Sequence, residues 1–191
     1  MCTRHRQSGI SLIELIMFIV IVSVAVAGIL LVMNVTTKSS ADPLVHKQSL
    51  AIAESLLEEV ELMPFTFCDP NDVNAASAVN AADCSPGLDQ NKGGAALTSA
   101  TPNSETRYSA SDPFDNVADY GNFSMPAGAI MDITNTNIGL AKYSASVAIT
   151  RKGSTIGLPN DAALLITVTV TGPDKLPVVL EGIRTRYSPN P

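Results

Sequence analysis

The sequence predicts an α+β protein in which a long N-terminal helix packs on a C-terminal antiparallel sheet. Three patterns predict this class. The run from Leu15 to Met33 carries no charged side chain, residues 44–63 repeat apolar side chains with a period near 3.6, and residues 143–187 alternate apolar with polar side chains. The helical and strand patterns each leave one apolar face, and we expect these two faces to cover each other.

The uncharged run is long enough to cross a membrane as a helix. Its nineteen residues span about 28 Å at the helical rise, which is close to the thickness of the hydrocarbon layer of a bilayer. Arg4, His5 and Arg6 precede the run, whereas the region after it is acidic. The positive-inside rule therefore predicts that Met1 lies in the cytoplasm and that the C-terminal domain lies outside.

The composition argues against nucleic-acid binding and against catalysis. The formal net charge is −6 over 191 residues, and nucleic acid requires a basic surface. The two histidines, His5 and His46, leave little material for imidazole chemistry or a zinc site. We therefore predict a protein that is not an enzyme and that needs no cofactor.

One carboxylate, Glu14, stands directly before the uncharged run. A carboxylate within a membrane span costs on the order of 2.5 to 3.5 kcal/mol, so such a residue normally has a specific partner. Cleavage after Gly9 would create an α-ammonium on Ile10, about one helical turn before Glu14. In an assembled bundle the ammonium could equally come from a neighbouring subunit, and the pair would then set the axial register of the helices. The alternative is a Glu14 that stays hydrated near the membrane surface, or is protonated.

A conventional signal peptide is the main competing interpretation, because Ala25-Val26-Ala27 has the form of a cleavage site after an apolar core. Cleavage there would leave the apolar residues 29–33 exposed at the new N-terminus. It would also give Glu14 no partner. Both observations favour cleavage after Gly9.

The residues from Gly9 to Leu15, GISLIEL, resemble the cleavage and methylation motif of type IV prepilins. That motif has a Gly before the scissile bond, an apolar first mature residue and a Glu at mature position five. The resemblance implies that a prepilin peptidase cuts between Gly9 and Ile10, that the Ile10 amine is methylated, and that Glu14 acts in assembly with other pilin subunits. It also implies the pilin fold, and insertion in the bacterial inner membrane before export to a surface filament. Most members have Phe where this chain has Ile10.

Four further segments resemble the D-type minor pilins of mannose-sensitive haemagglutinin (MSHA) pili. They are residues 33–43, 51–65, 68–70 and 114–120. This resemblance implies a minor structural subunit that serves pilus biogenesis and attachment. One alternative is a minor pseudopilin of a type II secretion system, which shares every N-terminal feature. Another is a membrane-anchored periplasmic binding domain that keeps its leader.

The three cysteines are Cys2, Cys68 and Cys84. Removal of the leader would take Cys2 away and leave one pair that encloses fifteen residues. A disulfide between Cys68 and Cys84 would stabilise the fold by about 3 kcal/mol in the chain-entropy model, and it implies an oxidising compartment. The alternative is two unrelated buried thiols, which the polar residues between them disfavour.

These observations divide the chain into four expected parts. They are a leader over residues 1–9, a transmembrane and assembly helix over 10–33, an amphipathic continuation of the helix over 34–63, and a periplasmic domain over 64–191. Within the last part we expect mostly irregular structure over 65–142, where Ala, Asn, Asp, Ser and Gly dominate, and a sheet over 143–187.

Pro43 predicts a kink or a break in the helix, with Asp42 as the N-cap of its second part. The second part should bury one apolar stripe, formed by Val45, Ile52, Leu56, Val60 and Met63. An acidic stripe of Glu54, Glu58 and Glu61 follows another side, and we interpret it as a solvated face. The alternative is a contact surface for basic patches of a neighbour.

Two acidic groups in the irregular region are candidate calcium ligands. Asp69, Asn71 and Asp72 match the start of an EF-hand loop. The complete loop needs Gly at position six and Glu at position twelve, where this chain has Asn74 and Asn80. The second group comprises Asp112, Asp115 and Asp119. Capping and turn roles explain that group more simply, and the sequence assigns no metal site.

Overall fold

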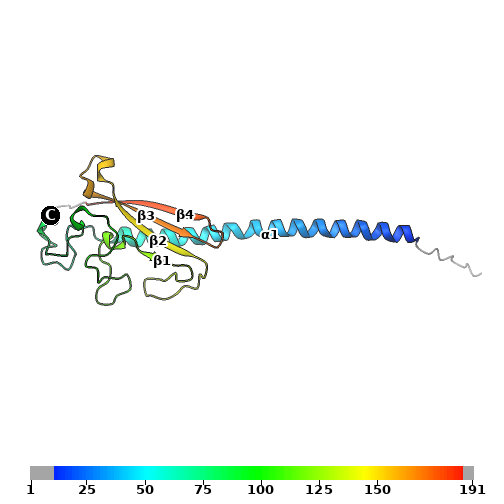
Figure 1. The fold of residues 1–191 in the computed structure, drawn as a ribbon, viewed down its shortest axis with the longest axis horizontal. Coiled ribbons are helices and arrows are strands. Elements are labelled where there is room, and N and C mark those ends of the chain that lie inside the picture. Colours follow the sequence, from blue (N-terminus) through cyan, green and yellow to red (C-terminus); the bar gives the residue numbers. More distant parts are fainter. Residues whose placement is uncertain (1–10, 187–191) are drawn as a thin grey trace, which may run out of the picture. The chain divides into compact units, whose positions relative to one another are not determined.

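A computed structural model of the chain describes residues 11–186, except for the side chains of residues 35–42. Contacts within the chain divide it into two compact units, Met1–Leu44 and Val45–Pro191. Figure 1 traces the elements along the chain, from helix α1 (Leu12–Leu62) to strand β4 (Pro177–Thr185). The α+β class predicted from the sequence is confirmed.

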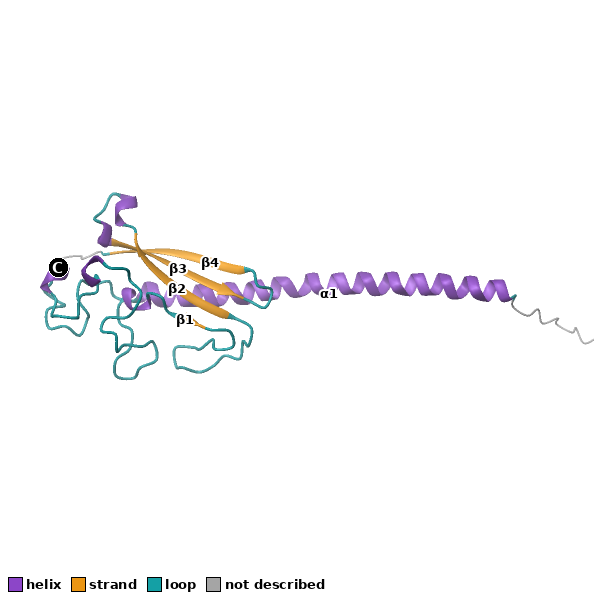
Figure 2. Cartoon of the chain, viewed as in Figure 1, coloured by secondary structure: helices purple, strands orange, loops and turns teal. Residues whose placement is uncertain are grey.

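Helix α1 continues through Pro43 without an interruption (Figure 2). The predicted break at Pro43, with Asp42 capping a second helix, is therefore wrong. A proline removes only one backbone donor, so a long helix can continue past it when the residues on both sides keep helical geometry. The helix ends at Leu62, next to the Met63-Pro64 pair that was expected to stop it.

Four antiparallel strands form one sheet, in the order β1-β2-β3-β4. Three of them coincide with the predicted strands: β2 (Ser144–Arg151), β3 (Ala163–Thr171) and β4 (Pro177–Thr185). The fourth, β1 (Ser124–Met125), lies at the edge beside β2 and inside the segment predicted to be irregular. Two residues are too few to show an alternating pattern, which is why the sequence did not indicate this strand.

The register of the sheet brings the apolar positions of β2 and β3 to one face. Ala145 lies opposite Val170, Val147 opposite Val168, and Ile149 opposite Ile166. All six side chains are buried. The face therefore needs a cover, as the alternation predicts.

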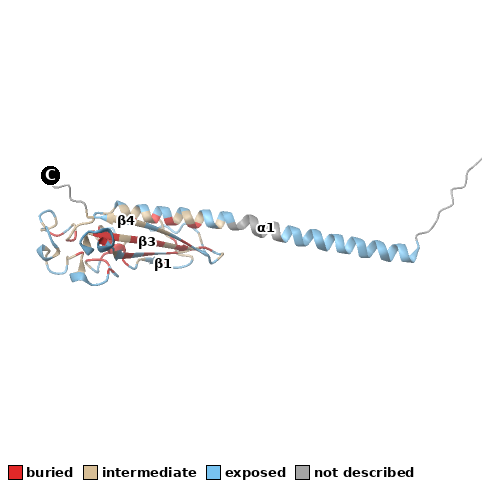
Figure 3. Ribbon diagram, turned by 90° about the horizontal axis from the view of Figure 1, so that it is seen from above, coloured by how far each residue is buried: buried red, intermediate tan, exposed pale blue. Residues whose placement is uncertain are grey.

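The part of α1 after Leu44 belongs to the same unit as the sheet and covers this face (Figure 3). Leu56 and Val60 of the predicted apolar stripe are buried, and Val45, Ile52 and Met63 are half-buried. Each large apolar side chain that is fully buried contributes about 1.5 to 3 kcal/mol. The small residues Ser49 and Ala53 are also buried, which lets the helix approach the strands closely.

Two glycines mark where helix and strands touch. A Cβ atom on Gly172 would lie 2.8 Å from Val45 Cγ1, and one on Gly182 would lie 2.0 Å from Glu61 Oε1. Glu61 is half-buried above β4, so it does not belong to the solvated stripe predicted from its spacing. Glu54 and Glu58 are exposed. The spacing of the glutamates predicts the face of the helix on which they lie. It does not show how far the sheet extends beneath that face.

Five short 3-10 helices complete the elements of the described residues. They are η1 (Ala81–Asp83), η2 (Lys92–Gly94), η3 (Val117–Tyr120), η4 (Gly153–Ile156) and η5 (Asn160–Ala162). The first three lie in the long connection between α1 and β2, and otherwise only β1 interrupts that connection with regular structure. This connection carries most of the polar side chains that are buried.

Candidate functional site

The N-terminal part of α1 is an uncovered apolar helix. Residues Leu12–Asn34 are long and apolar enough to cross a membrane, and none of this segment is buried within the chain. Its large apolar side chains are between 40% exposed, at Val22, and 76% exposed, at Leu12. The segment is coloured as exposed over its whole length in Figure 3. The 23 residues correspond to about 35 Å of helix, enough for the hydrocarbon layer. We call Leu12–Asn34 the apolar segment.

Glu14 is the one charged residue of the apolar segment. It is exposed, it lies in the first turn of α1, and it forms no ion pair within residues 11–186. Ser23, by contrast, satisfies its hydroxyl locally by donating to the Ile19 carbonyl at 2.6 Å. The predicted cleavage residue Gly9 and the predicted amine partner Ile10 lie outside the described residues. The pairing predicted for Glu14 is therefore not tested by the described residues.

Residues 4–30 match the prokaryotic N-terminal methylation motif. This match supports a type IV pilin-like or pseudopilin-like subunit. It begins within the predicted leader and ends inside the apolar segment, so it includes Glu14. No curated protein and no solved structure matches the chain. The proteins that carry this motif are structural subunits, and the pilin-like fold of the chain agrees with it.

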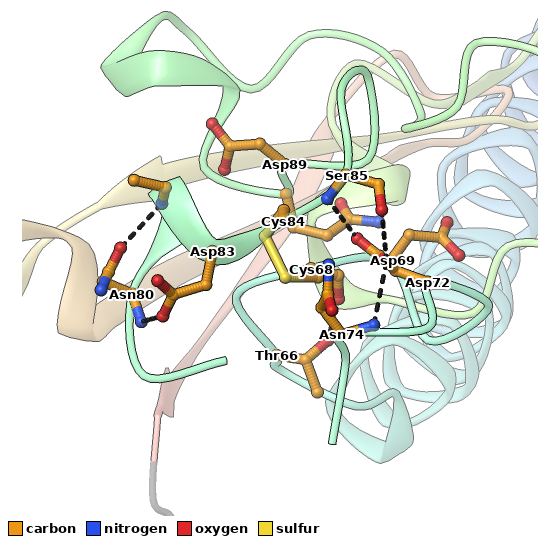
Figure 4. The surroundings of a disulfide bond; sticks show 12 residues. Thr66, Cys68, Asp69, Asp72, Asn74, Asn80, Asp83, Cys84, Ser85 and Asp89 are labelled. Carbon is orange, nitrogen blue, oxygen red and sulfur yellow. Dashed lines mark hydrogen bonds between the residues drawn. A yellow bond between two sulfur atoms is a disulfide. The ribbon is translucent and has the colours of Figure 1, made fainter. Parts of the chain in front are cut away.

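A disulfide joins Cys68 to Cys84, the pair that the sequence predicts. Figure 4 shows the polar side chains around it. Asp72 accepts hydrogen bonds from the Asn74 amide at 3.0 Å and from the Ser85 amide at 2.7 Å. These bonds lower the pKa of the Asp72 carboxyl, and the bond from the Asn74 amide has the largest effect. Asp72 therefore holds together the two loops that the disulfide links.

The segment that begins like an EF-hand forms turns. Asp69 Oδ1 accepts the Asn71 amide at 2.7 Å, and Asp72 Oδ1 accepts the Asn74 amide two residues further along in the same way. Each contact is an Asx turn, in which the carboxylate replaces a backbone acceptor.

A buried ion pair anchors the connection to α1. Arg107 donates from Nε and Nη2 to the two carboxylate oxygens of Glu59, at 2.6 Å each, and Tyr120 donates to Glu59 Oε1 at 2.7 Å. The Arg107 and Glu59 side chains are only 5% and 12% exposed. Burial opposes the charge of Arg107, but the hydrogen bonds and charge of Glu59 outweigh it and raise the Arg107 pKa. The sequence indicated neither Arg107 nor its partner, because 48 positions separate them.

Three carboxylates from separate loops meet in the same unit. Asp69, Glu105 and Asp115 each place an oxygen within 4.8 Å of the others, and we call them the acidic cluster. Asp69 is 0% exposed and Glu105 is 3% exposed. Burial raises the pKa of Glu105 to about 10, and the charge of Asp119 adds to the effect. Burial likewise raises the pKa of Asp115 to about 6, with the charge of Asp69 as the next cause.

The aspartates that the sequence grouped together have different roles. Asp119 is buried and caps η3, where its carboxylate accepts the Asn116 amide at 2.8 Å and the Thr101 amide at 3.0 Å. Asp112 accepts the Ser104 hydroxyl at 2.7 Å and is not a member of the acidic cluster. Glu105 was missed, since no motif surrounds it. It is brought to Asp69 and Asp115 only by the path of the loops.

Proposed function

We propose that the chain is a minor structural subunit of a type IV pilus of the MSHA kind, assembled through its N-terminal helix. The observation that carries this proposal is the apolar segment, which is uncovered over its whole length and holds one carboxylate, Glu14, that has no ion pair within residues 11–186. Burial of each of its large side chains contributes about 1.5 to 3 kcal/mol, so the segment requires lipid or other helices around it. The methylation motif over residues 4–30 supports a segment that first inserts in the lipid of a membrane and then packs among the helices of other subunits in a filament.

The proposed order of insertion, cleavage and assembly follows from the charges at the N-terminus of the chain. The basic residues before the segment favour insertion in the inner membrane with residues 64–191 in the periplasm. A prepilin peptidase then removes residues 1–9 between Gly9 and Ile10, and the new Ile10 amine is methylated, which keeps its positive charge. In the filament this ammonium pairs with Glu14 of a neighbouring subunit, so that neither charge is left alone among apolar helices. The disulfide fits the oxidising periplasm.

A minor pseudopilin of a type II secretion system is the second candidate, because the motif match supports it equally. The resemblance of residues 51–65 and 114–120 to D-type MSHA pilins is what favours the pilus. The two candidates differ in the partners that the chain should contact. Crosslinking in cells, followed by identification of the partner subunits, separates them: partners from a pilus support the first candidate, and partners from a secretion piston support the second.

Mass spectrometry of the N-terminal peptide tests where the mature chain begins. We expect the peptide to begin at Ile10 and to carry one methyl group on its amine. A peptide that begins at Gly28 would show that a conventional signal peptidase acts after Ala27. A peptide that begins at Met1 would show an uncut anchor, and the chain would then be a membrane-anchored periplasmic domain.

The test of assembly uses Glu14→Ala with Glu54→Ala as its control. Both variants remove one carboxylate from α1, but Glu54 is exposed in the other unit. We expect Glu14→Ala to be inserted and cleaved normally, and to be depleted from sheared filaments and from crosslinks to partner pilins. Glu54→Ala should assemble at the wild-type level. Wild-type assembly of Glu14→Ala would refute the role of this residue.

A further inference from the structure

We propose that Asp69, Glu105 and Asp115 form a binding site for one divalent cation, and that the cation is Ca²⁺. The inference goes beyond the proposed function and does not depend on it. It rests on three features of the acidic cluster: the spacing of its carboxylates, the lack of hydrogen-bond donors to four of its buried oxygens, and the absence of an ion pair with any described side chain.

The spacing suits a calcium ion. The three contributed oxygens lie within 4.8 Å of one another. Oxygen ligands lie about 2.3 to 2.6 Å from Ca²⁺, so two ligands on opposite sides of the ion are about 4.6 to 5.2 Å apart. This spacing is therefore compatible with one Ca²⁺ shared by the three carboxylates. Mg²⁺ usually keeps several of its waters, which a group with such buried ligands does not favour.

The carboxylate oxygens lack the partners that buried polar atoms require. Neither carboxylate oxygen of Glu105 accepts a hydrogen bond from an N–H or O–H group of the described residues, although the residue is only 3% exposed; the carboxyl instead lies close to those of Asp69 and Asp119. Asp69 Oδ2 and Asp115 Oδ1 are also unpaired. The remaining oxygens of the two aspartates are used, by the Asn71 amide on Asp69 and by the Asn71 side chain on Asp115. The used oxygens hold the aspartates in place, and the unpaired ones are left for a ligand.

No cation of the described chain neutralises the cluster. None of its three carboxylates forms an ion pair within residues 11–186. Lys92 interacts electrostatically with Glu105, but its ammonium donates to the Ala100 carbonyl at 3.1 Å and to the Thr101 hydroxyl. Arg107 is engaged by Glu59. Buried carboxylates of like charge are costly, so the cluster must be neutralised either by a proton, which the raised pKa of Glu105 keeps on that carboxyl, or by a divalent cation that displaces the proton.

The three ligands come from different parts of the connection between α1 and β2. Asp69 follows the disulfide residue Cys68, Asp115 directly precedes the cap of η3, and Glu105 lies in a turn whose amide bonds to the Pro102 carbonyl at 3.1 Å. A cation would join these three loops at one point. Binding to the folded state alone would stabilise that state, as any such ligand does.

The experiment uses the full chain purified in detergent, freed of metal with a chelator and then titrated with CaCl₂. We expect calorimetry to show one Ca²⁺ per chain. We expect the thermal midpoint to rise by about 5 to 10 °C at a hundredfold excess over Kd, and MgCl₂ at the same concentration to give a much smaller rise. An equal rise with MgCl₂ would overturn the choice of Ca²⁺. No binding at millimolar CaCl₂ would overturn the site and favour a shared proton.

Two matched variants complete the test. Glu105→Gln keeps the shape of the side chain and removes a carboxylate without partners, so the metal-free variant should unfold at or above the wild-type midpoint. It should lose the calcium-dependent rise. Asp112→Asn removes a nearby carboxylate outside the cluster and should keep the rise. A Glu105→Gln protein that still responds to CaCl₂ would contradict the proposal, as would an Asp112→Asn protein that does not.

Discussion

Two glutamates of helix α1 have opposite surroundings. Glu14 lies among exposed apolar side chains and has no ion pair within residues 11–186, whereas Glu59 is held by Arg107 and Tyr120 of its own unit. The unit that begins at Val45 pairs this charge internally. Within the described residues, the N-terminal unit leaves both its apolar surface and its carboxylate exposed. The comparison separates the part of the helix that serves the folded core from the part that, in our proposal, serves association between molecules.

Removal of Glu59 should have the largest effect on stability. Glu59→Ala leaves Arg107 buried without its carboxylate, and breaking a buried pair in this way costs about 3 to 5 kcal/mol. We expect a clearly lower midpoint in denaturant unfolding of the full chain in detergent. Glu54→Ala on the exposed side of the same helix is the control, and it should change the free energy of unfolding by less than about 0.5 kcal/mol. A similar midpoint for both variants would show that Glu59 contributes no more to stability than the exposed Glu54.

Removal of the disulfide should be the next largest effect. The double variant Cys68→Ser with Cys84→Ser opens the loop and should lower the free energy of unfolding by about 3 kcal/mol. Non-reducing peptide mapping of the wild-type chain should first show the Cys68–Cys84 bond. Two free thiols, in protein alkylated before extraction, would contradict this bond.

A substitution at the contact between α1 and the sheet should have a moderate effect. Gly172→Ala places a Cβ atom 2.8 Å from Val45 Cγ1, so one of the two must move. Such overpacking typically costs about 1 to 3 kcal/mol. Gly28→Ala is the matched control, because no atom lies within 4 Å of a Cβ at that position. Equal unfolding midpoints for the two variants would show that this part of the helix is not in tight contact with the strands.

The smallest effect on stability should come from Glu14→Ala, the variant expected to reduce assembly into filaments. Glu14 is exposed and belongs to the other unit, so its removal should change the free energy of unfolding of the unit that begins at Val45 by less than about 0.5 kcal/mol. Denaturant unfolding in detergent measures this directly. A large loss of stability would mean that the assembly defect is a folding defect, and the contrast between Glu14 and Glu59 would no longer hold.

Local patterns in the sequence determined much of the fold. The apolar segment, the buried stripe with Leu56 and Val60, and the alternation that became β2 and β3 are all repeats within short windows, and such repeats depend only on the geometry of a helix or a strand. The prepilin motif is also local, and the match over residues 4–30 supports it. The disulfide could be predicted because the third cysteine, Cys2, lies in the predicted leader.

Only the tertiary structure decided the contacts between distant residues. The pairing of Glu59 with Arg107, the burial of Glu61 above Gly182, and the two-residue strand β1 leave no periodic signal. The acidic cluster is the clearest case, because the sequence grouped Asp112, Asp115 and Asp119 by their spacing, whereas the loops bring Asp69 and Glu105 to Asp115. Backbone propensities act over a few residues. The path of an irregular connection is set by what its side chains bury and pair with, and those partners are chosen only when the whole unit has folded.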